Sequence, residues 1–220
     1  MPFRRNRTVS VPKWEKANLT GLRHLVFTTR GDEYRGEWKD NLKHGNGHYK
    51  WKNSGAIYEG TWENNKKNGF GVLSVPAKDQ YLRKYVGHWK DNKFHGYGTL
   101  SYTRDEYYEG EFLDSSRHGW GKMHWANGDV YEGEWQNDKR HGRGMLDIAN
   151  GQRVECHWFK DKKVGPGKHY FPLTGQLLRG YWTDDVCRSG TIEDLDWRSA
   201  PNKTPFPIPK VSKSKSKYEN

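Results

Sequence analysis

The stretch Tyr-Glu-Gly-Glu-Trp at residues 131–135, with His-Gly-Arg-Gly at 141–144, decides the fold of this 220-residue chain. The same two elements, Tyr-x-Gly-x-Trp and then Gly-x-Gly, recur along most of the sequence. The steps between successive copies are 24, 27, 23, 23, 23 and 24 residues. A fixed period of this length indicates one small unit stacked several times, which presents a long surface rather than a deep pocket. The copies begin at Tyr34, Tyr58, Tyr85, Tyr108 and Tyr131, and two weaker copies begin at Val154 and Leu178.

Each copy is expected to form a two-stranded hairpin. Counting the leading tyrosine as position 1, the side chains at positions 1, 3 and 5 (Tyr131, Gly133 and Trp135) share one face of an extended strand, because side chains alternate with period two. The polar stretch 136–140 has the composition of a turn, and a second strand follows over about 141–148. The paired glycines have the same parity as the rings, so a neighbouring ring can lie flat across bare backbone.

Stacking of these hairpins predicts an all-β fold, an elongated single-layer antiparallel meander. A lone hairpin is marginal in water, whereas stacked copies share a continuous face lined by rings. The composition agrees, because only 32% of residues are hydrophobic but 15% are aromatic, with 11 tryptophans. Two strands at ~4.8 Å give ~10 Å per copy, so seven copies make a ribbon roughly 65–70 Å long.

The period also sets the expected organisation of the chain. A basic arm at 1–20 precedes a half-copy at 21–33 that caps the first repeat, and a Pro-rich and Lys/Ser-rich tail occupies 194–220. The degenerate last copies suit the terminal cap that stacked repeats require. The seven copies are expected at 34–57, 58–84, 85–107, 108–130, 131–153, 154–177 and 178–193.

The positive charge belongs to the two ends of the chain. The net charge is +11, yet residues 31–200 carry 26 basic and 25 acidic side chains. Basic termini can bind acidic proteins or anionic lipid, and they can equally be free, solvated tails. The candidate residues at these ends are Arg4, Arg5, Arg7, Lys213, Lys215 and Lys217.

Cysteine usage and hydropathy indicate the cellular compartment to expect. The two cysteines, Cys156 and Cys187, occupy different positions of different copies, which suits free thiols in a reducing compartment. The first residues lead into no apolar run, and no stretch approaches the ~20 apolar residues of a spanning helix. We therefore expect a cytoplasmic protein or one attached to a cytosolic structure.

Several catalytic and ligand-binding classes are disfavoured. Histidines recur at position 11 of four copies, but copies ~10 Å apart cannot share one zinc, whose ligands lie within ~3.5 Å of each other. No phosphate-binding glycine loop and no nucleophile arrangement stand out from the repeat. Core rings on a nearly neutral body make nucleic acid an unlikely partner. We expect no cofactor, no metal and no enzymatic activity.

These residues resemble the MORN repeat, the membrane occupation and recognition nexus motif, over about residues 34–190. The Tyr-Glu-Gly-Glu-Trp, the Asn/Asp-Lys turn and the His-Gly-x-Gly pair carry the resemblance. The family includes radial-spoke head proteins of cilia, junctional membrane proteins, and modules attached to lipid kinases and a histone methyltransferase. Its small repeat-only members imply an adaptor of male germ cells, with a place in the sperm flagellum, the ciliary axoneme or the acrosome and a role in spermatogenesis.

The expected function is therefore a non-catalytic scaffold that binds other sperm or ciliary proteins, including microtubule-associated ones. The alternative is a peripheral membrane module that recognises anionic phospholipid through the basic termini. An open sheet could also form a homodimer by pairing along its edge. The candidate groove consists of Tyr34, Trp38, Trp62, Trp89, Tyr108, Trp135 and Trp182. Insertions in repeat proteins map to loops, so we expect a loop at 76–84, and the candidates in this loop and in the tail are Tyr81, Arg83, Lys84, Phe206 and Ile208.

Overall fold

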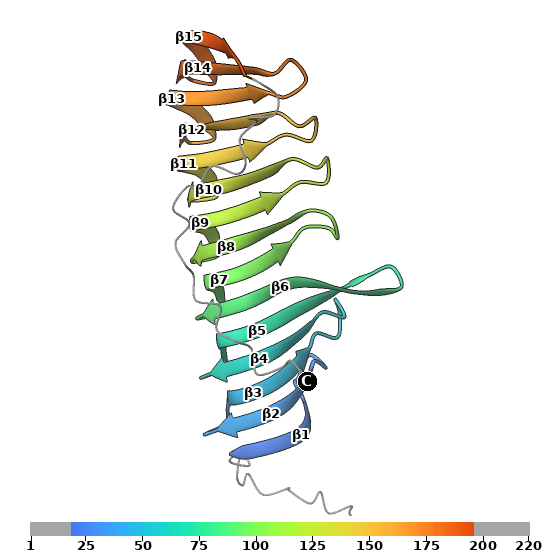
Figure 1. Cartoon of the computed structure of the whole chain (residues 1–220). Coiled ribbons are helices and arrows are strands. Elements are labelled where there is room, and N and C mark those ends of the chain that lie inside the picture. The colour runs from blue at the N-terminus through green and yellow to red at the C-terminus, as the bar shows by residue number, and fades with distance from the viewer. Residues whose placement is uncertain (1–18, 196–220) are drawn as a thin grey trace, which may run out of the picture.

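The computed structural model describes residues 19–195 as one open, single-layer sheet in which every strand pairs antiparallel with the next strand of the chain (Figure 1). The strands lie side by side in chain order along an elongated ribbon, and the described residues contain no helix. The all-β meander expected from the sequence is confirmed. The fifteen strands are β1 (Gly21–Phe27), β2 (Glu33–Lys39), β3 (Leu42–Lys50), β4 (Ile57–Glu63), β5 (Lys66–Ala77), β6 (Gln80–Lys90), β7 (Lys93–Ser101), β8 (Tyr107–Leu113), β9 (Ser116–His124), β10 (Val130–Gln136), β11 (Lys139–Asp147), β12 (Arg153–Phe159), β13 (Lys162–Phe171), β14 (Gln176–Thr183) and β15 (Val186–Asp194).

The turn inside each copy is formed by two residues in the left-handed region. Asn137 and Asp138, which join β10 to β11, have φ values of 50° and 65°. Adjacent residues with positive φ define the hairpin turn whose twist matches that of the flanking strands. Asn and Asp tolerate this conformation because their short polar side chains bond locally. The same pair of positive φ values recurs in every copy, so the sequence fixes the hairpin length.

The insertion at 76–84 does not form the long loop expected from the sequence. Strands β5 and β6 continue into it, with Pro76 opposite Tyr81 and Ala77 opposite Gln80. Lys78, with φ 49°, begins the tight turn that closes them. The extra residues lengthen both strands, β5 to 12 and β6 to 11 residues, with a register shift between Leu73 and Ser74, so the ladder extends and this hairpin projects beyond its neighbours (Figure 1).

The core is a column of tyrosine rings lying on glycine backbone. Tyr131 is completely buried, and its hydroxyl donates to the carbonyl of Glu134 at 3.2 Å. Gly133 and Gly144 are cross-strand partners beneath this ring. A Cβ at Gly144 would stand 2.1 Å from the Tyr131 hydroxyl oxygen, so only glycine leaves room for the ring.

The rings of successive copies interlock edge to face. Tyr131 meets Trp135 of its own copy at 5.2 Å between ring centroids and Trp158 of the next copy at 5.5 Å. Such pairs contribute ~0.5–1.5 kcal/mol each beyond the buried area. The arrangement begins at Tyr34 and repeats through five copies, with Phe112 in place of one tryptophan. It stops at Trp158, because Val154 stands where the next tyrosine would be.

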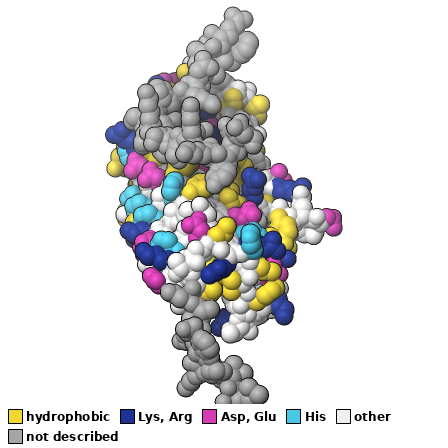
Figure 2. Space-filling view, turned by 90° about the horizontal axis from the view of Figure 1, so that it is seen from below, with side chains coloured by type: hydrophobic (Ala, Val, Ile, Leu, Met, Phe, Trp, Pro, Cys, Tyr) yellow, Lys and Arg dark blue, Asp and Glu magenta, His cyan; other side chains and the backbone are white. Residues whose placement is uncertain are grey.

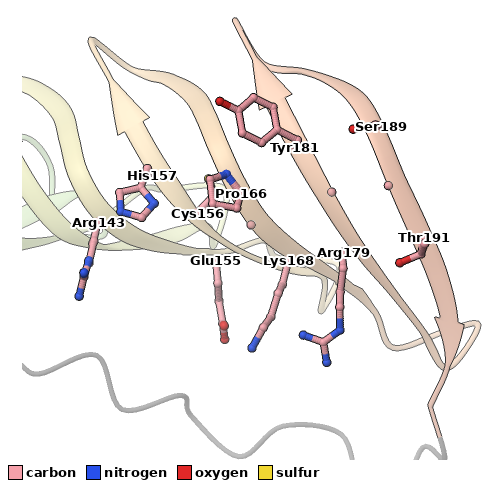
Figure 3. Close-up of a pocket in the computed structure, with 13 residues that line it drawn as sticks. Arg143, Glu155, Cys156, His157, Pro166, Lys168, Arg179, Tyr181, Ser189 and Thr191 are labelled. Carbon is pink, nitrogen blue, oxygen red and sulfur yellow. The ribbon is translucent and has the colours of Figure 1, made fainter.

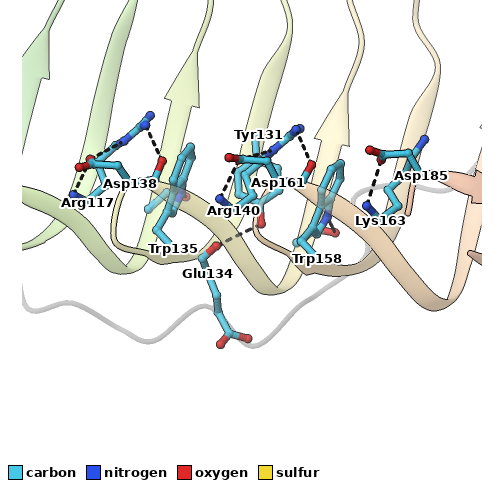
Figure 4. Close-up of polar contacts among 12 residues, drawn as sticks. Arg117, Tyr131, Glu134, Trp135, Asp138, Arg140, Trp158, Asp161, Lys163 and Asp185 are labelled. Carbon is cyan, nitrogen blue, oxygen red and sulfur yellow. Dashed lines mark hydrogen bonds and ion pairs between the residues drawn. The ribbon is translucent and has the colours of Figure 1, made fainter. Parts of the chain in front are cut away.

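Neighbouring copies are also joined through their turns. The backbone N–H of Asp161 donates to the carbonyl of Arg140 at 3.0 Å, and the N–H of Arg140 donates to the Asp161 carboxylate at 2.9 Å (Figure 4). The guanidinium of Arg140 bonds the same carboxylate at 3.3 Å and lies 4.1 Å from the Trp158 ring. The same reciprocal pair of bonds joins Leu19 to Asn41, whose N–H donates to the Leu19 carbonyl and whose Oδ1 accepts the Leu19 N–H, so residues before β1 dock on the first copy in the same way.

Candidate functional site

The sheet has two faces of different character, which we call the ring face and the second face. The ring face carries positions 1, 3 and 5 of each copy. The second face carries positions 2, 4, 13 and 15, because the residue between the two glycines points away from the rings. In three successive copies position 13 is aromatic, at Phe70, Tyr97 and Trp120. We call these three residues the aromatic column.

The aromatic column is accessible where the core is not. Phe70 is 40% exposed and Tyr97 38%, and Trp120 is partly buried. Each ring lies on the second strand of its copy, so neighbouring rings are ~10 Å apart along the ribbon. Exposed apolar surface of this kind marks interaction sites. Three rings in line at this spacing suit an elongated partner segment rather than a compact small molecule.

Carboxylates flank the aromatic column on the second face. Glu111 is the cross-strand partner of Tyr97, and Glu134 is that of Trp120. Each carboxylate accepts a backbone N–H of the following strand, Glu111 from Trp120 at 3.1 Å and Glu134 from Arg143 at 3.0 Å. These bonds hold the carboxylates against the sheet, so copies four and five present fixed negative charge beside the rings.

The candidate groove residues lie mainly in the core. Trp62 is 6% exposed, Trp89, Trp135 and Trp182 are 3% exposed, Tyr34 is 1% exposed and Tyr108 is fully buried, whereas Trp38 is partly buried. The indole N–H of Trp135 donates to the carbonyl of Gly121 at 3.2 Å, which ties the ring to the previous copy. These contacts give the rings a structural role and leave a partner little surface to reach. That they line a partner groove stays a prediction.

The other candidates are spread over the ribbon or lie outside the described residues. Tyr81 is 47% exposed and its hydroxyl donates to Gly55 at 3.2 Å, while Lys84 lies 5.3 Å from the Tyr102 ring. Arg83 faces Ser74 across the lengthened hairpin. The following candidates fall outside the described residues: Arg4, Arg5, Arg7, Phe206, Ile208, Lys213, Lys215 and Lys217.

The end of the ribbon formed by β1 is mixed in character. Figure 2, which looks at this end, shows basic, acidic and histidine side chains interspersed with hydrophobic ones among the described residues. Leu22 and Phe27 of β1 are 65% and 63% exposed. Within residues 19–195, no group of three or more His, Cys, Asp or Glu could hold a metal, and no helix is long and apolar enough to span a membrane.

Burial changes the acidity of several side chains on the ring face. Burial raises the pKa of the Cys156 thiol to about 12 and the pKa of Tyr131 far above its ordinary value. Burial lowers the pKa of Lys67, whose ammonium lies 4.2 Å from the Trp89 ring, to about 8. These shifts accompany packing between copies, and they point to no proton-transfer role.

Comparison with known proteins identifies the class to which this fold belongs. The MORN repeat family matches at residues 34–56, 58–76, 85–104, 108–130, 131–153 and 157–172. The chain is a member of the MORN repeat family. Members of this family are interaction modules for proteins or membranes and are not known as enzymes.

The similar proteins carry one name. MORN repeat-containing protein 3 of Xenopus laevis is 50% identical over 217 residues, covering 96% of this chain and 91% of that protein. The Bos taurus protein of the same name is 60% identical over 217 residues, covering 96% and 90%. The Homo sapiens protein is 63% identical over 201 residues, covering 90% and 84%. A solved virginiamycin B lyase from Staphylococcus aureus also matches, but a TM-score of 0.18 at 9% identity supports no inference.

Proposed function

We propose that this protein is a non-catalytic scaffold that binds other proteins along the second face and serves in the assembly of a sperm flagellum or ciliary axoneme. The observation that carries the proposal is the aromatic column. The ring face already holds the rings that stabilise the fold, so Phe70 and Tyr97 are free of that role. Exposed aromatic side chains on a rigid sheet are typical anchors of protein interfaces.

The cellular setting of the proposal rests on family resemblance. Small repeat-only MORN proteins resemble adaptors of male germ cells and cilia, which supports a cytoplasmic protein at the flagellar axoneme or acrosome. Expression of the tagged chain in ciliated cells tests this part. Signal along the axoneme supports it, and uniform cytoplasmic signal contradicts it.

The binding surface is tested by affinity capture from sperm or ciliated-cell lysate. The test variant carries Phe70→Ser, Tyr97→Ser and Trp120→Ser, which removes the aromatic column. The matched control carries Phe159→Ser and Leu113→Ser, two apolar side chains at the turns that are 51% and 45% exposed. We expect the test variant to lose the proteins that the native chain and the control both retain. Equal capture by all three would contradict the proposal, provided that all three give the same β-sheet circular dichroism spectrum.

Membrane binding through the basic termini is the second candidate function. Family membership favours it only in that members of the family bind proteins or membranes. Its surface is different from the aromatic column, so the two candidates separate cleanly. Liposomes containing phosphatidylserine should pellet the full chain at ~0.15 M salt under this alternative and should not pellet a chain lacking residues 1–20 and 201–220. Absence of pelleting by the full chain would remove the alternative.

Edge pairing into a homodimer also stays a prediction. All nine residues of β15 are exposed, so its outer edge is open among the described residues. Unpaired edge strands are templates for further pairing. Light scattering coupled to size exclusion measures the mass directly, and a monomer at ~100 μM would contradict the dimer.

A further inference from the structure

A hollow of about 880 Å³ lies at the last three copies, where strands β11 to β15 form its floor (Figure 3). It lies on the second face, beyond the aromatic column. Figure 3 shows Glu155, Lys168 and Arg179 extending to the same side of the sheet. The hollow uses none of the candidate residues that the repeat pattern indicates.

The hollow exists because the last copies lack an aromatic side chain at position 13. Position 13 is aromatic in copies two to four, but Pro166 stands there in copy six and Ser189 occupies the equivalent place in copy seven. Gly167, Gly180 and Gly190 follow one another as cross-strand partners in this floor, but a Cβ on them would point to the ring face, where one at Gly180 would meet Cys187 and Trp182. The space on the second face therefore comes from the small side chains of Pro166 and Ser189, which let a peptide approach the sheet.

Positive charge surrounds this floor. Arg143, Lys168 and Arg179 line the hollow, and Glu155 supplies a carboxylate. Arg179 is bonded to Glu193 at 3.0 Å, whereas the structure shows no ion pair for Arg143 or Lys168 with any residue of the described chain. Two basic groups therefore remain available for a ligand.

The charge reverses abruptly on the same face. In copies four and five the second face presents Glu109, Glu111, Glu132 and Glu134, against Lys122, which pairs with Glu132 at 3.3 Å, and Arg143 at the border of the hollow. An acidic ligand is attracted to the hollow and repelled by the adjoining copies. This step in charge both selects an acidic ligand and fixes where it sits.

We propose that this hollow binds an extended acidic segment of a partner protein, rich in Asp and Glu, whose carboxylates meet Arg143 and Lys168 and which lies over Pro166 and Ser189. Hydroxyl groups of Tyr181, Ser189 and Thr191 line the hollow and can donate hydrogen bonds to carboxylates. The inference rests on the scaffold function and adds the chemistry of one ligand. The chain's own end is a poor occupant, because residues 201–220 carry five lysines and one glutamate.

The test uses the full chain and a fluorescent decapeptide of Asp, Glu and Gly, with a Lys and Gly decapeptide as the comparison, followed by fluorescence polarisation at ~0.05 and ~0.15 M salt. The variant Arg143→Met with Lys168→Met removes the two available charges. The matched control, Lys139→Met with Lys160→Met, removes two exposed charges from turns of the same copies. Met keeps the apolar stem of each side chain, so the fold should be retained.

We expect the dissociation constants of the acidic peptide for the native chain and the control to agree within twofold. The dissociation constant for the hollow variant should be at least tenfold larger, and all three should bind more weakly at higher salt. The Lys peptide should not compete. Equal binding by both variants would show nonspecific attraction and overturn the inference. Binding only after deletion of 201–220 would assign the hollow to the chain's own tail and also overturn it. If the aromatic-column variant loses its captured proteins while no acidic peptide binds, the scaffold function stands and this inference falls.

Discussion

Replacement of Gly144 by alanine should destabilise the sheet through the tyrosine that lies above it. The backbone at Gly144 does not adopt a positive φ, so alanine is unstrained there and only the packing is tested. Its Cβ would stand 2.1 Å from the hydroxyl oxygen of Tyr131, 2.5 Å from Cζ and 2.6 Å from Cε2. The ring must move, because ordinary contacts between carbon atoms begin near ~3.5 Å.

The cost follows from the contacts that the Tyr131 ring makes. Overpacking costs ~1–3 kcal/mol, and the lost hydrogen bond to Glu134 costs ~1 kcal/mol. Displacement also weakens the edge-to-face contacts with Trp135 and Trp158, ~0.5–1.5 kcal/mol each. The lower entropy of the unfolded alanine chain returns ~0.4–1 kcal/mol. We expect a net loss of about 2–4 kcal/mol in the free energy of unfolding.

A double-mutant cycle isolates the ring as the cause. The sixth copy already has Val154 where the tyrosine would be, and there Cys156 replaces the first glycine of the pair. In a Tyr131→Val background, Gly144→Ala should therefore cost less than ~1 kcal/mol, and the difference is the coupling energy. Urea unfolding followed by tryptophan fluorescence and far-ultraviolet circular dichroism measures each corner. An equal cost in the Tyr and Val backgrounds would refute the role assigned to the ring.

Three further predictions concern the junctions between copies. Asp161→Ala should lower the free energy of unfolding by ~1–2 kcal/mol in urea melts, because the carboxylate accepts the N–H of Arg140 and bonds its guanidinium. Lys67, with its pKa lowered to about 8 from 10.5, binds fewer protons folded than unfolded between these values, so the native chain should gain stability relative to Lys67→Met as pH rises from 8 to 10.5 in thermal melts. A thiol reagent at pH 8 should label exposed Cys187 and leave Cys156 unlabelled until unfolding, because burial protects Cys156 and raises its pKa to about 12.

For each of these predictions a control variant or a specific result would contradict the expectation. Asp114→Ala, which breaks an exposed ion pair with Lys93 at 3.7 Å and likewise puts alanine at a positive φ (50°), should cost less than Asp161→Ala, and an equal loss would discredit the junction. A stability difference between native chain and Lys67→Met that falls or stays constant above pH 8 would contradict the buried ammonium. Equal labelling rates for the two thiols would contradict the packing of the sixth copy.

The sequence predicts the meander because its signals are local and repeated. The Tyr-x-Gly-x-Trp alternation specifies strands and their inner face, and the Asn/Asp pairs specify the turns. The insertion was wrongly expected to form a loop, because the pairing of Pro76 with Tyr81 depends on register across the turn and on no repeated residue type. Extra residues added to both strands of a hairpin extend its ladder, with a bulge between Leu73 and Ser74 taking up the difference, and composition alone does not reveal this.

The aromatic column was missed for a related reason. Position 13 holds no constant residue type, so it leaves no periodic signal, although its place between two glycines does set the face to which it points. The groove prediction instead fell on the recurring rings at positions 1 and 5. In a single-layer sheet those rings are the available core, and the structure buries six of the seven candidates. The variable positions carry what distinguishes one copy from another.

The division of labour between the two faces is tested most directly by hydroxyl-radical footprinting of the native chain with mass spectrometry. Phe70 and Tyr97 should be oxidised in the folded protein, while Trp89 and Trp135 should stay protected until urea unfolds it. Tryptophan reacts with hydroxyl radicals faster than tyrosine and phenylalanine do. Protection of Trp89 and Trp135 would therefore show that burial, and not low reactivity, shields them. Oxidation of Trp89 and Trp135 at the same rate in the folded and unfolded chain would contradict the account.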